Sequence, residues 1–464
     1  MKTQQTLQLL REYESRNVLF TEPDGSWPIV WERAKGVHVW DAEGKKYLDL
    51  TAAFGVAAAG HANPNVVKAG QKQMAKLLHA MGDVHPHALK AQLARELSRI
   101  TFERWTKGTR KAESGKAQTG KVIFSNSGFE AVESALKTAM LATGKRGIIA
   151  FEGGYHGLGY GALNATHREH FRSPFRSQLR QFGHFVPFPK SSRSSRREEA
   201  HSKNRQSAIG NRQLMEPPYV GCHEVETRIR QLFRREKIGA ILVEPIQARG
   251  GINIPPPEFL PLLRKLCDEH GALLILDEIY TGFGRTGKWF ACEHSGVIPD
   301  LICLGKALTG GFPLSACVGR ADLMDAAWPA STGEAIHTST FLGHPVGCTM
   351  ALAQIAEIRR LELCERSAKL GKLLLHQLDS LATRHPSLVT SIRGLGLMVG
   401  VELSLPDGTP ATEAAIGAIK MMLRHGFIML PEGEHGNVIS FTPPLTISKA
   451  QLAKAVAALA EVLK

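Results

Sequence analysis

Short apolar runs alternate with amphipathic stretches through the middle of the chain. Between residues 121 and 304 the apolar runs are three to five residues long, which suits buried strands better than helices. The stretches between them carry apolar residues at helical spacing. This alternation is typical of a mostly parallel sheet with helices on both faces, so the predicted fold class is α/β. The expected strands are 122–124, 147–151, 240–243, 272–276 and 301–304, and the expected helices are 130–141 and 259–270.

The two ends of the chain have a different pattern. A turn at residues 44–46 separates two short strand-like runs and predicts an N-terminal β-hairpin. After about Gly333 the pattern changes to long helical windows with one strand-like run among them. We predict a large domain over residues 63–333 and a smaller α+β domain formed by residues 1–62 and 334–464. The expected elements at the two ends are the strands 37–40, 47–50 and 396–403, a helix after Pro64, and the helices 346–363, 366–381, 412–425 and 448–463.

The composition is that of an ordinary folded protein. Of the 464 residues, 43% are hydrophobic and 22% are charged, which excludes collagen-like, wholly disordered and disulfide-scaffold classes. The net charge is +14, but residues 161–215 hold eleven basic and three acidic residues and so supply +8 of it. The charge is therefore local and is not spread along the chain as a polyanion-binding groove would require.

Much of that local charge lies in a polar stretch at residues 190–213. Only Ala200, Ala208 and Ile209 are apolar there, so the stretch cannot bury enough surface to offset its ordering entropy. We predict a disordered, solvated insertion. A nucleic-acid or membrane tether is the alternative, but no aromatic residue interleaves with the arginines. We expect no nucleic-acid partner and no membrane partner.

The seven cysteines are widely spaced and include no C-x-x-C pair, which argues against a disulfide framework and against a metal site. Several stand within apolar runs, where a thiol packs as a small hydrophobic group, so we expect reduced core residues. The first sixteen residues are polar and mixed in charge, unlike a signal peptide, and no window holds ~18 uninterrupted apolar residues. These features predict a cytoplasmic protein that binds no metal.

Two predicted strands end in residues that suit chemistry. The first strand is followed by small polar residues up to Ser127 and then by Gly128 at the start of a helix. The amides of a helix N-terminus bind phosphate, although a simple N-cap would give the same pattern. The strand at 272–276 ends in Asp277 and Glu278. Functional groups gather at the carboxyl ends of parallel strands, and a carboxylate there needs a catalytic cation, a metal or a salt bridge.

A third strand end delivers a lysine. Residues 301–304 form an apolar strand, and Lys306 follows it. A lysine in a dry pocket has a lowered pKa, so its free amine can form a Schiff base, although a solvated surface amine would give the same pattern. Together, a phosphate cradle, Asp277 and Lys306 specify pyridoxal 5'-phosphate. The lysine would be the aldimine partner, and the aspartate would keep the pyridine nitrogen protonated.

Six motifs follow one another along nearly the whole chain: Ser127-Gly128-Phe129-Glu130-Ala131, Val243-Glu244-Pro245-Ile246-Gln247, Leu276-Asp277-Glu278 with Gly282-Phe283-Gly284-Arg285-Thr286-Gly287, Pro299-Asp300-Leu301 with Gly305-Lys306, Thr340-Phe341-Leu342-Gly343, and Arg393-Gly394-Leu395-Gly396-Leu397. In these motifs and their order the chain resembles the class III pyridoxal-phosphate-dependent aminotransferases. The resemblance implies the fold type I architecture, a homodimer with active sites at the interface, and a ping-pong transfer of an amino group from an amino acid or amine to a 2-oxo acid.

The resemblance implies a role for each matching residue. Lys306 would form the internal aldimine and move the substrate Cα proton, and Asp277 would pair with the pyridinium nitrogen. Arg393 would grip the substrate α-carboxylate with its guanidinium fork. The other residues would hold the cofactor: Ser127, Gly128 and Phe129 at the phosphate, Tyr155 stacked on the ring unless it is a core aromatic, His156 next to it in the chain, Glu244 in support of Asp277 or of the neighbouring hydrogen-bond network, Gln247 at the phenolic oxygen or the ring, and Thr340 at the phosphate of the partner subunit.

Three positions depart from the pattern of the family members that exchange ω-amines with 2-oxoglutarate. Arg249 stands where they usually carry a Glu, Leu158 where many carry an Arg, and His344 where Asn is common. These departures argue against 2-oxoglutarate and against an acetylornithine or 4-aminobutyrate assignment. If Arg249 points outward, pyruvate or another monocarboxylate is the expected acceptor; if it points inward, it would bind a dicarboxylate. Its place just past a strand end favours the inward orientation.

Two other functions remain open on the sequence. An aminomutase, racemase or decarboxylase of the same family would keep Lys306 and Asp277 but would turn over without an added 2-oxo acid. A basic nucleic-acid-binding protein is the alternative from a different class. It is disfavoured because the chain outside residues 161–215 carries a net charge of only +6.

Overall fold

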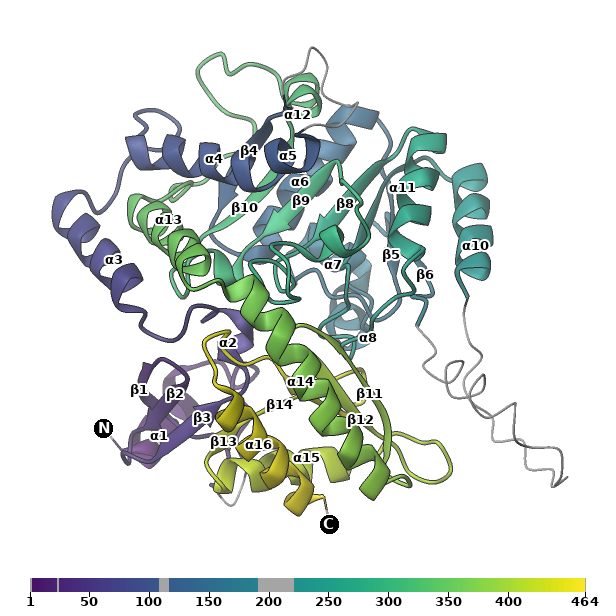
Figure 1. Cartoon of the computed structure of the whole chain (residues 1–464). Helices are drawn as coiled ribbons and strands as arrows, with labels where there is room; N and C mark the ends of the chain where they lie inside the picture. Colours follow the sequence, from purple (N-terminus) through teal and green to yellow (C-terminus); the bar gives the residue numbers. More distant parts are fainter. Residues whose placement is uncertain (1, 23–24, 108–116, 191–220, 464) are drawn as a thin grey trace, which may run out of the picture.

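A seven-stranded sheet forms the centre of the structure (Figure 1), a computed structural model that describes residues 2–22, 25–107, 117–190 and 221–463. Strand β10 is antiparallel to both of its neighbours, and every other neighbouring pair in this sheet is parallel. The predicted mostly parallel sheet is confirmed: it contains all five expected strands, with β6 and β10 in addition. In spatial order the strands are β4 (Gly120–Ser125), β10 (Ser315–Arg320), β9 (Leu301–Leu304), β8 (Leu273–Asp277), β7 (Ile238–Val243), β5 (Gly147–Phe151) and β6 (Gly183–Val186).

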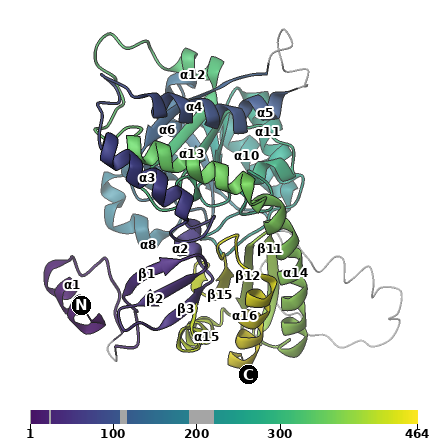
Figure 2. The ribbon, with the colours of Figure 1, turned by 60° about the vertical axis from the view of Figure 1, so that its left-hand side comes forward.

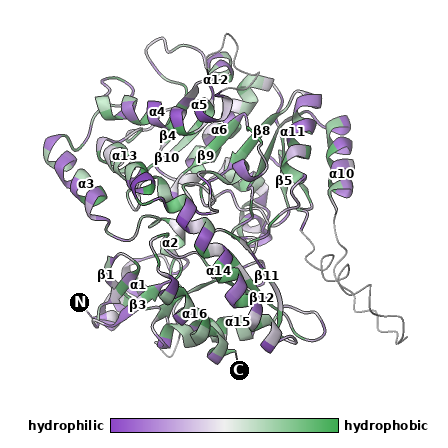
Figure 3. Cartoon of the chain, viewed as in Figure 1, coloured by the Kyte–Doolittle hydropathy of each residue, from purple (hydrophilic) through white to green (hydrophobic). Residues whose placement is uncertain are grey.

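Alternate residues of the central strands face opposite helical layers. In β8, Ile275 packs into one apolar cluster, whereas Leu274 and Leu276 belong to the larger cluster on the other face. The first face carries α6 (Gly128–Thr143), α7 (Tyr160–Ala165) and α12 (Ala321–Ala327), and the other carries α4 (Ala88–Ile100), α10 (Cys222–Arg235), α11 (Phe259–His270) and α13 (Pro345–Arg360). Burial on both faces explains the unbroken apolar runs. Figure 3 shows mainly hydrophobic central strands and helices, such as α10, that also carry hydrophilic residues.

Two four-stranded sheets from the chain ends lie beside the central layers (Figure 2). One of them joins the predicted N-terminal hairpin to a strand from near the C-terminus, with Leu48 opposite Phe427 in a parallel pair. The other is antiparallel throughout. The smaller α+β part is thus confirmed, while its boundaries at residues 62 and 333 stay a prediction. The strands are β1 (Trp31–Lys35), β2 (His38–Asp41), β3 (Lys46–Asp49) and β13 (Phe427–Ile428) in the first sheet, and β11 (Val389–Leu395), β12 (Met398–Leu403), β15 (Val438–Phe441) and β14 (Leu430–Glu432) in the second.

The helices of the chain ends complete the fold. The predicted long helices are present as α13, α14, α15 and α16, and the helix after Pro64 is α3. Helix α14 follows α13 in the chain and runs from the central layers down to the smaller sheets (Figure 1). The remaining bounds are α1 (Thr3–Tyr13), α2 (Ala52–Gly55), α3 (Pro64–Lys76), α5 (Phe102–Thr106), α8 (Glu169–Arg172), α14 (Leu363–Arg384), α15 (Thr412–Arg424) and α16 (Lys449–Val462).

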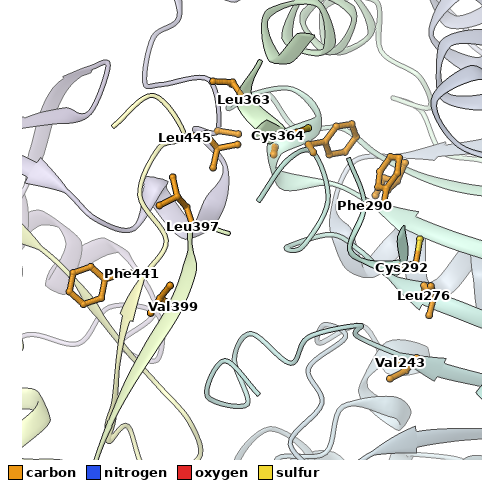
Figure 4. Close-up of a cluster of buried hydrophobic side chains, with 14 of the residues drawn as sticks. Val243, Leu276, Phe290, Cys292, Leu363, Cys364, Leu397, Val399, Phe441 and Leu445 are labelled. Atoms are coloured by element: carbon orange, nitrogen blue, oxygen red, sulfur yellow. The ribbon is translucent and has the colours of Figure 1, made fainter. Parts of the chain in front are cut away.

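One continuous core joins the central layers to the smaller sheets. Figure 4 shows buried side chains of this core, with Phe290 on the side of the central strands and Leu397 and Phe441 on the side of the smaller sheets. Arg285 adds a polar link, because its buried guanidinium donates to the carbonyl oxygens of Leu397 at 3.0 Å and Pro443 at 2.6 Å. Burial lowers the pKa of Arg285 to about 10. Its hydrogen bonds therefore tie the two parts together inside the core.

The cysteines behave as the sequence predicts. All seven are free, and all except Cys222 are buried. In the described part of the chain, no helix is both long enough and apolar enough to cross a membrane. The predicted insertion at 190–213 lies, apart from Lys190, outside the described residues.

Two helical glycines differ in the space around them and give a matched test of how α14 packs. A Cβ on Gly371 of α14 would lie 2.0 Å from the carbonyl oxygen of Gly396, whereas a Cβ on Gly417 of α15 would meet nothing within 4 Å. We expect Gly371→Ala to destabilise the protein by roughly 1–3 kcal/mol, because backbone must move to admit the methyl group. Gly417→Ala should stabilise it by about 0.5–1 kcal/mol. Thermal unfolding followed by circular dichroism checks this; shifts of the same sign in both variants would contradict the packing.

Candidate active site

Five of the predicted site residues follow the carboxyl ends of parallel strands. Strands β5, β7, β8 and β9 are paired in parallel one after another, so their carboxyl ends lie along the same edge of the sheet. Tyr155 and His156 follow β5, Glu244 follows β7, Asp277 ends β8, and Lys306 follows β9. The fold therefore brings these five residues to one edge, although they are spread over more than half of the large part of the chain.

Lys306 lies just past β9, where the chain turns sharply. Its φ of +40° is a left-handed conformation that residues with a side chain rarely adopt, so the surrounding structure holds it under strain. Its Nζ atom lies 4.6 Å from the centroid of the Tyr280 ring. Burial lowers the pKa of Lys306 below its ordinary value, although the carboxylates of Asp277 and Glu244 act against this change. A lowered pKa gives the amine a larger uncharged fraction, as a nucleophilic lysine needs.

The two carboxylates at the end of β8 have different partners. Asp277 accepts a hydrogen bond from the amide of Ile279 at 3.1 Å, and its other oxygen lies 2.8 Å from Nδ1 of His156. Glu278 instead accepts from the Thr281 hydroxyl at 2.5 Å and from two backbone amides at 2.8 Å. Burial raises the pKa of Glu278 to about 7. Glu278 thus anchors the following loop, and Asp277 is the strand-end carboxylate that has a ring partner.

The start of α6 is both an N-cap and a possible phosphate site, the two alternatives that the sequence left open. The Glu130 carboxylate accepts from the amide of Ser127 at 2.7 Å and from its hydroxyl at 2.8 Å, so Ser127 serves in the cap. The next amides, those of Gly128 and Phe129, belong to the first turn and have no intrahelical acceptor. A Cβ on Gly128 would lie 3.0 Å from Cδ1 of Ile279, so glycine permits the close approach of the helix to the segment that follows β8. The helix is capped and still offers amides to an anion.

Glu244 and Gln247 hold the loops that surround the site. Glu244 is buried and accepts from the amides of Tyr155 at 3.0 Å and Ala248 at 3.1 Å. Burial raises the pKa of Glu244 to about 7. The Gln247 side chain donates to the carbonyl oxygen of Glu152 at 2.7 Å and accepts from the Asn253 side chain at 3.1 Å. Both residues thus fix the segment that carries Tyr155, and their contact with a cofactor stays a prediction.

Arg393, the predicted α-carboxylate ligand, has protein partners on its guanidinium. It donates to the carbonyl oxygen of Ile252 at 3.0 Å and to that of Gly251, and it pairs with Glu402. The pKa of Glu402 is lowered: burial would raise it, but the charge of Arg393 and its hydrogen bond outweigh that effect. A substrate carboxylate at Arg393 would therefore replace Glu402 or a backbone carbonyl.

The segment before α13 carries two further sequence features. Thr340 is exposed in a turn, and its contact with a partner subunit's phosphate stays a prediction. His344 accepts a hydrogen bond from the amide of Val346 at 3.3 Å and so caps α13. Its ring nitrogen does here what the more common Asn would do, which makes this departure a structural one.

Arg249 forms an ion pair with Glu432, a residue that the sequence did not indicate. The Glu432 side chain is buried, and its Oε2 lies 3.6 Å from Nε of Arg249. Burial raises the pKa of Glu432 to about 7, although the charges of Arg249 and Arg168 oppose the change. Arg168 donates to the carbonyl oxygen of Gly433. No feature of the sequence distinguishes the buried Glu432 from Glu434, which follows two residues later and is exposed.

Comparison with known proteins gives the class and the family. Residues 20–463 match the family described as Aminotransferase class-III, and the chain belongs to that family. It is 35% identical over 428 residues to an acetylornithine aminotransferase of Methanosarcina mazei, covering 92% of this chain and 90% of the relative. It is 34% identical over 471 residues to a putrescine aminotransferase of Pectobacterium atrosepticum, covering 99% of this chain and 89% of the relative. Its fold matches the crystal structure of a Bacillus anthracis aminotransferase with a TM-score of 0.83 and 28% identity, covering 100% of this chain and 99% of that structure's chain.

These matches confirm the predicted family, fold and activity: the protein is a pyridoxal-phosphate-dependent aminotransferase. The residues at the sheet edge fit that cofactor. A buried carboxylate, Asp277, suits a protonated ring nitrogen, and Lys306 offers an amine whose pKa is lowered. The first-turn amides of α6 suit a phosphate. Each of these groups matches a different part of the cofactor.

Removing the charge of Asp277 should lower the catalytic rate strongly. Asp277→Asn keeps the shape of the side chain but removes the negative charge that would hold a proton on the ring nitrogen, so we expect kcat to fall by roughly 10²–10³ while cofactor absorbance is retained. Steady-state kinetics and an absorbance spectrum check this. Glu278→Gln, which changes the neighbouring carboxylate, should lower thermal stability with a much smaller effect on kcat. Near-normal turnover of Asp277→Asn would refute the role.

Proposed function

We propose that transamination takes place at this sheet edge, with Lys306 carrying the cofactor and acting as the base. The most direct support is the position of Lys306. It follows β9, which pairs in parallel with β8, the strand that ends in Asp277. Burial lowers the pKa of its amine. Bound pyridoxal phosphate supplies an electron sink for the substrate Cα. In each half of a ping-pong exchange, Nζ of Lys306 takes up and returns the Cα proton as a general base and acid.

The neighbouring residues orient the reacting groups. Asp277 holds the proton on the ring nitrogen, and His156 fixes the orientation of the Asp277 carboxylate from 2.8 Å. Glu244 accepts a hydrogen bond from the backbone amide of Tyr155, and the Tyr155 ring would stack on the bound cofactor. The amides of Gly128 and Phe129 bind the phosphate, while Ser127 keeps the helix start in place through its cap.

For the amino acceptor we infer a dicarboxylate such as 2-oxoglutarate. The guanidinium carbon of Arg249 lies 5.7 Å from the centroid of the Tyr155 ring, and its charge helps to lower the pKa of Lys306, after burial. Both observations support the inward orientation of Arg249. Leu158 is exposed and offers no charge to a second carboxylate. Arg393 takes the α-carboxylate when Glu402 gives way. The donor is an amine or amino acid, as the relatives named for acetylornithine and putrescine suggest.

We propose that the enzyme is a homodimer. Two segments, 77–84 and 336–341, expose large apolar side chains and are held together by a hydrogen bond of 2.8 Å from the Thr338 hydroxyl to Asp83 and by a contact between the His79 and Phe341 rings. An exposed apolar patch of this kind suits a protein interface. Thr340 lies within it, where it would reach the phosphate of the partner subunit. The exposed apolar residues of the patch are Leu77, Leu78, Met81, Val84, Ile336 and Phe341.

The cytoplasm is the compartment we propose for this enzyme. All seven of its cysteines are free thiols, which suits a reducing environment. The amino acid and 2-oxo acid substrates of transamination are also small and water-soluble.

Chemical trapping tests the role of Lys306. Reduction of the yellow holoenzyme with borohydride should fix the cofactor onto Lys306, because this lysine combines a lowered pKa with a place beside Asp277. Peptide mapping by mass spectrometry identifies the modified residue. Lys306→Ala should lose both the adduct and transamination, whereas Lys145→Ala should keep both, because Lys145 donates to the carbonyl oxygens of His270 and Gly271 at the end of α11. An adduct on any other lysine of the wild-type protein would sink the assignment.

A charge placed in the apolar patch tests the homodimer. Leu78→Glu buries an unpaired carboxylate in the proposed interface, so we expect dissociation to monomers and loss of most activity. Leu405→Glu is the matched control, because Leu405 is similarly exposed and lies in the loop after β12. Light scattering at micromolar concentration, combined with activity assays, checks both variants. A fully active wild-type monomer would rule the homodimer out.

A further inference from the structure

The amine of Lys306 lies over the face of an aromatic ring. Its Nζ is 4.6 Å from the centroid of the Tyr280 ring, inside the ~6 Å within which a ring attracts a cation. In the described part of the chain, neither Asp277 nor Glu244 forms a hydrogen bond with this amine. Their carboxylates instead accept from backbone amides, and Asp277 also pairs with His156. The ring face is thus the partner that the fold presents to Nζ.

The hydroxyl of Tyr280 has a different partner. It lies 3.2 Å from the hydroxyl oxygen of Thr442, whose own hydroxyl donates to the carbonyl oxygen of Thr51 at 3.3 Å. Because Thr442 uses its single hydroxyl proton there, Tyr280 is the donor to Thr442. Burial raises the pKa of the Tyr280 phenol, so the phenol keeps this proton. The hydroxyl is therefore not a base for the amine, and the ring face is what Tyr280 offers to Lys306.

Three other segments hold the ring in place. Tyr280 is 8% exposed and belongs to a small apolar cluster that includes Met398 of β12. Gly55 of α2 lies against the ring edge, where a Cβ on this glycine would be 2.3 Å from Cε2 of Tyr280. The φ of Gly55 is +81°, a conformation that favours glycine. Since the hydrogen bond to Thr442 fixes the hydroxyl end, the ring has little freedom to turn away from Lys306.

The charge of Lys306 changes during the proposed reaction. The amine must be uncharged to take up the Cα proton, and it is an ammonium until it returns that proton. Burial lowers the pKa of Lys306 and so disfavours the ammonium form. The negative face of an aromatic ring attracts an ammonium but hardly an uncharged amine. Tyr280 therefore acts on one of the two states of this amine.

We propose that Tyr280 is a positioning residue of transamination, whose ring face holds the ammonium form of Lys306 while this amine carries the proton. This proposal rests on the proposed role of Lys306 as the base and adds a residue that acts through it. A hydrogen-bonded carboxylate in the same place would bind the ammonium more strongly and so resist the return of the proton, whereas a ring supplies a weaker attraction. Tyr280 thus keeps Lys306 able both to take up the proton and to give it back.

Substitutions of Tyr280 in the holoenzyme separate the ring from its hydroxyl. Tyr280→Leu removes the ring, so we expect kcat to fall about 5- to 30-fold because the ammonium form loses its partner. For the same reason, the pH at which kcat rises to half its maximum should move about 0.7–1.5 units lower. Tyr280→Phe keeps the ring and should keep both values. Phe283→Leu is the matched control: it removes a buried ring three residues further along, packed on Phe290, and should lower thermal stability without moving the pH profile.

A fluorinated ring tests the same point without a change of shape, should Tyr280→Leu fail to fold. Incorporation of 3,4,5-trifluorophenylalanine at position 280 keeps the size of phenylalanine but withdraws electron density from the ring face. Compared with Tyr280→Phe, it should lower kcat and shift the pH profile in the same direction as Tyr280→Leu. A ring that only fills space would give the values of Tyr280→Phe, and that result would overturn the proposal.

Labelling of the amine gives a readout besides activity. The full chain, stripped of cofactor and checked for folding by circular dichroism, is treated with acetic anhydride over a range of pH, and peptide mapping follows the adduct on Lys306. The pH of half-maximal labelling should be about 0.7–1.5 units lower in Tyr280→Leu than in the wild type and unchanged in Tyr280→Phe. An unchanged value in Tyr280→Leu, or equal losses of kcat in the Leu and Phe variants, would overturn the proposal. A wild type that does not transaminate, or that attaches the cofactor to another lysine, would instead refute the proposed function.

Discussion

Parallel pairing of β8 and β9 fixes where the amine and the carboxylate meet. Asp277 stands opposite Cys303 in this pair, and Lys306 follows three residues later, so strands roughly 4.8 Å apart deliver both groups to one edge. Burying either charge alone would be costly, whereas each offsets part of the cost of the other. The strained backbone at Lys306 is tolerated because the sheet on one side and the apolar core on the other hold it in place.

The smaller part of the chain supplies the remaining charges of the site. Arg393 comes from β11 and Glu432 from β14, and each has an oppositely charged partner, Glu402 and Arg249. The two pairs differ in their hydrogen bonds: Arg393 donates to backbone carbonyl oxygens and to the Glu402 carboxylate, while Nε of Arg249 and Oε2 of Glu432 lie 3.6 Å apart without a hydrogen bond. A ligand at Arg393 must therefore displace an existing hydrogen-bond partner, whereas Nε of Arg249 has no such partner to lose.

The sequence predicted those features that depend on local pattern. The strands of the central sheet and the residues at their ends, Asp277 and Lys306 among them, follow from short apolar runs and from what comes directly after them. Features that depend on a distant partner were not predictable. Glu432 has no local feature that distinguishes it from an exposed loop acid. The antiparallel direction of β10 shows only in its pairing with β4 and β9, which are distant in the sequence or reached through a loop. Likewise, only the folded chain reveals that the guanidinium of Arg393 already has acceptors.

The core that runs through both parts of the chain also limits how a substrate can enter. A hinge opening between them would expose apolar side chains such as Leu397 and would take the guanidinium of Arg285 away from its two carbonyl oxygens. A guanidinium left without those acceptors while still buried would cost several kcal/mol. We therefore expect a rigid scaffold whose gate consists of side chains and short loops, and a rate of product release that reflects their rotation instead of the closure of two lobes.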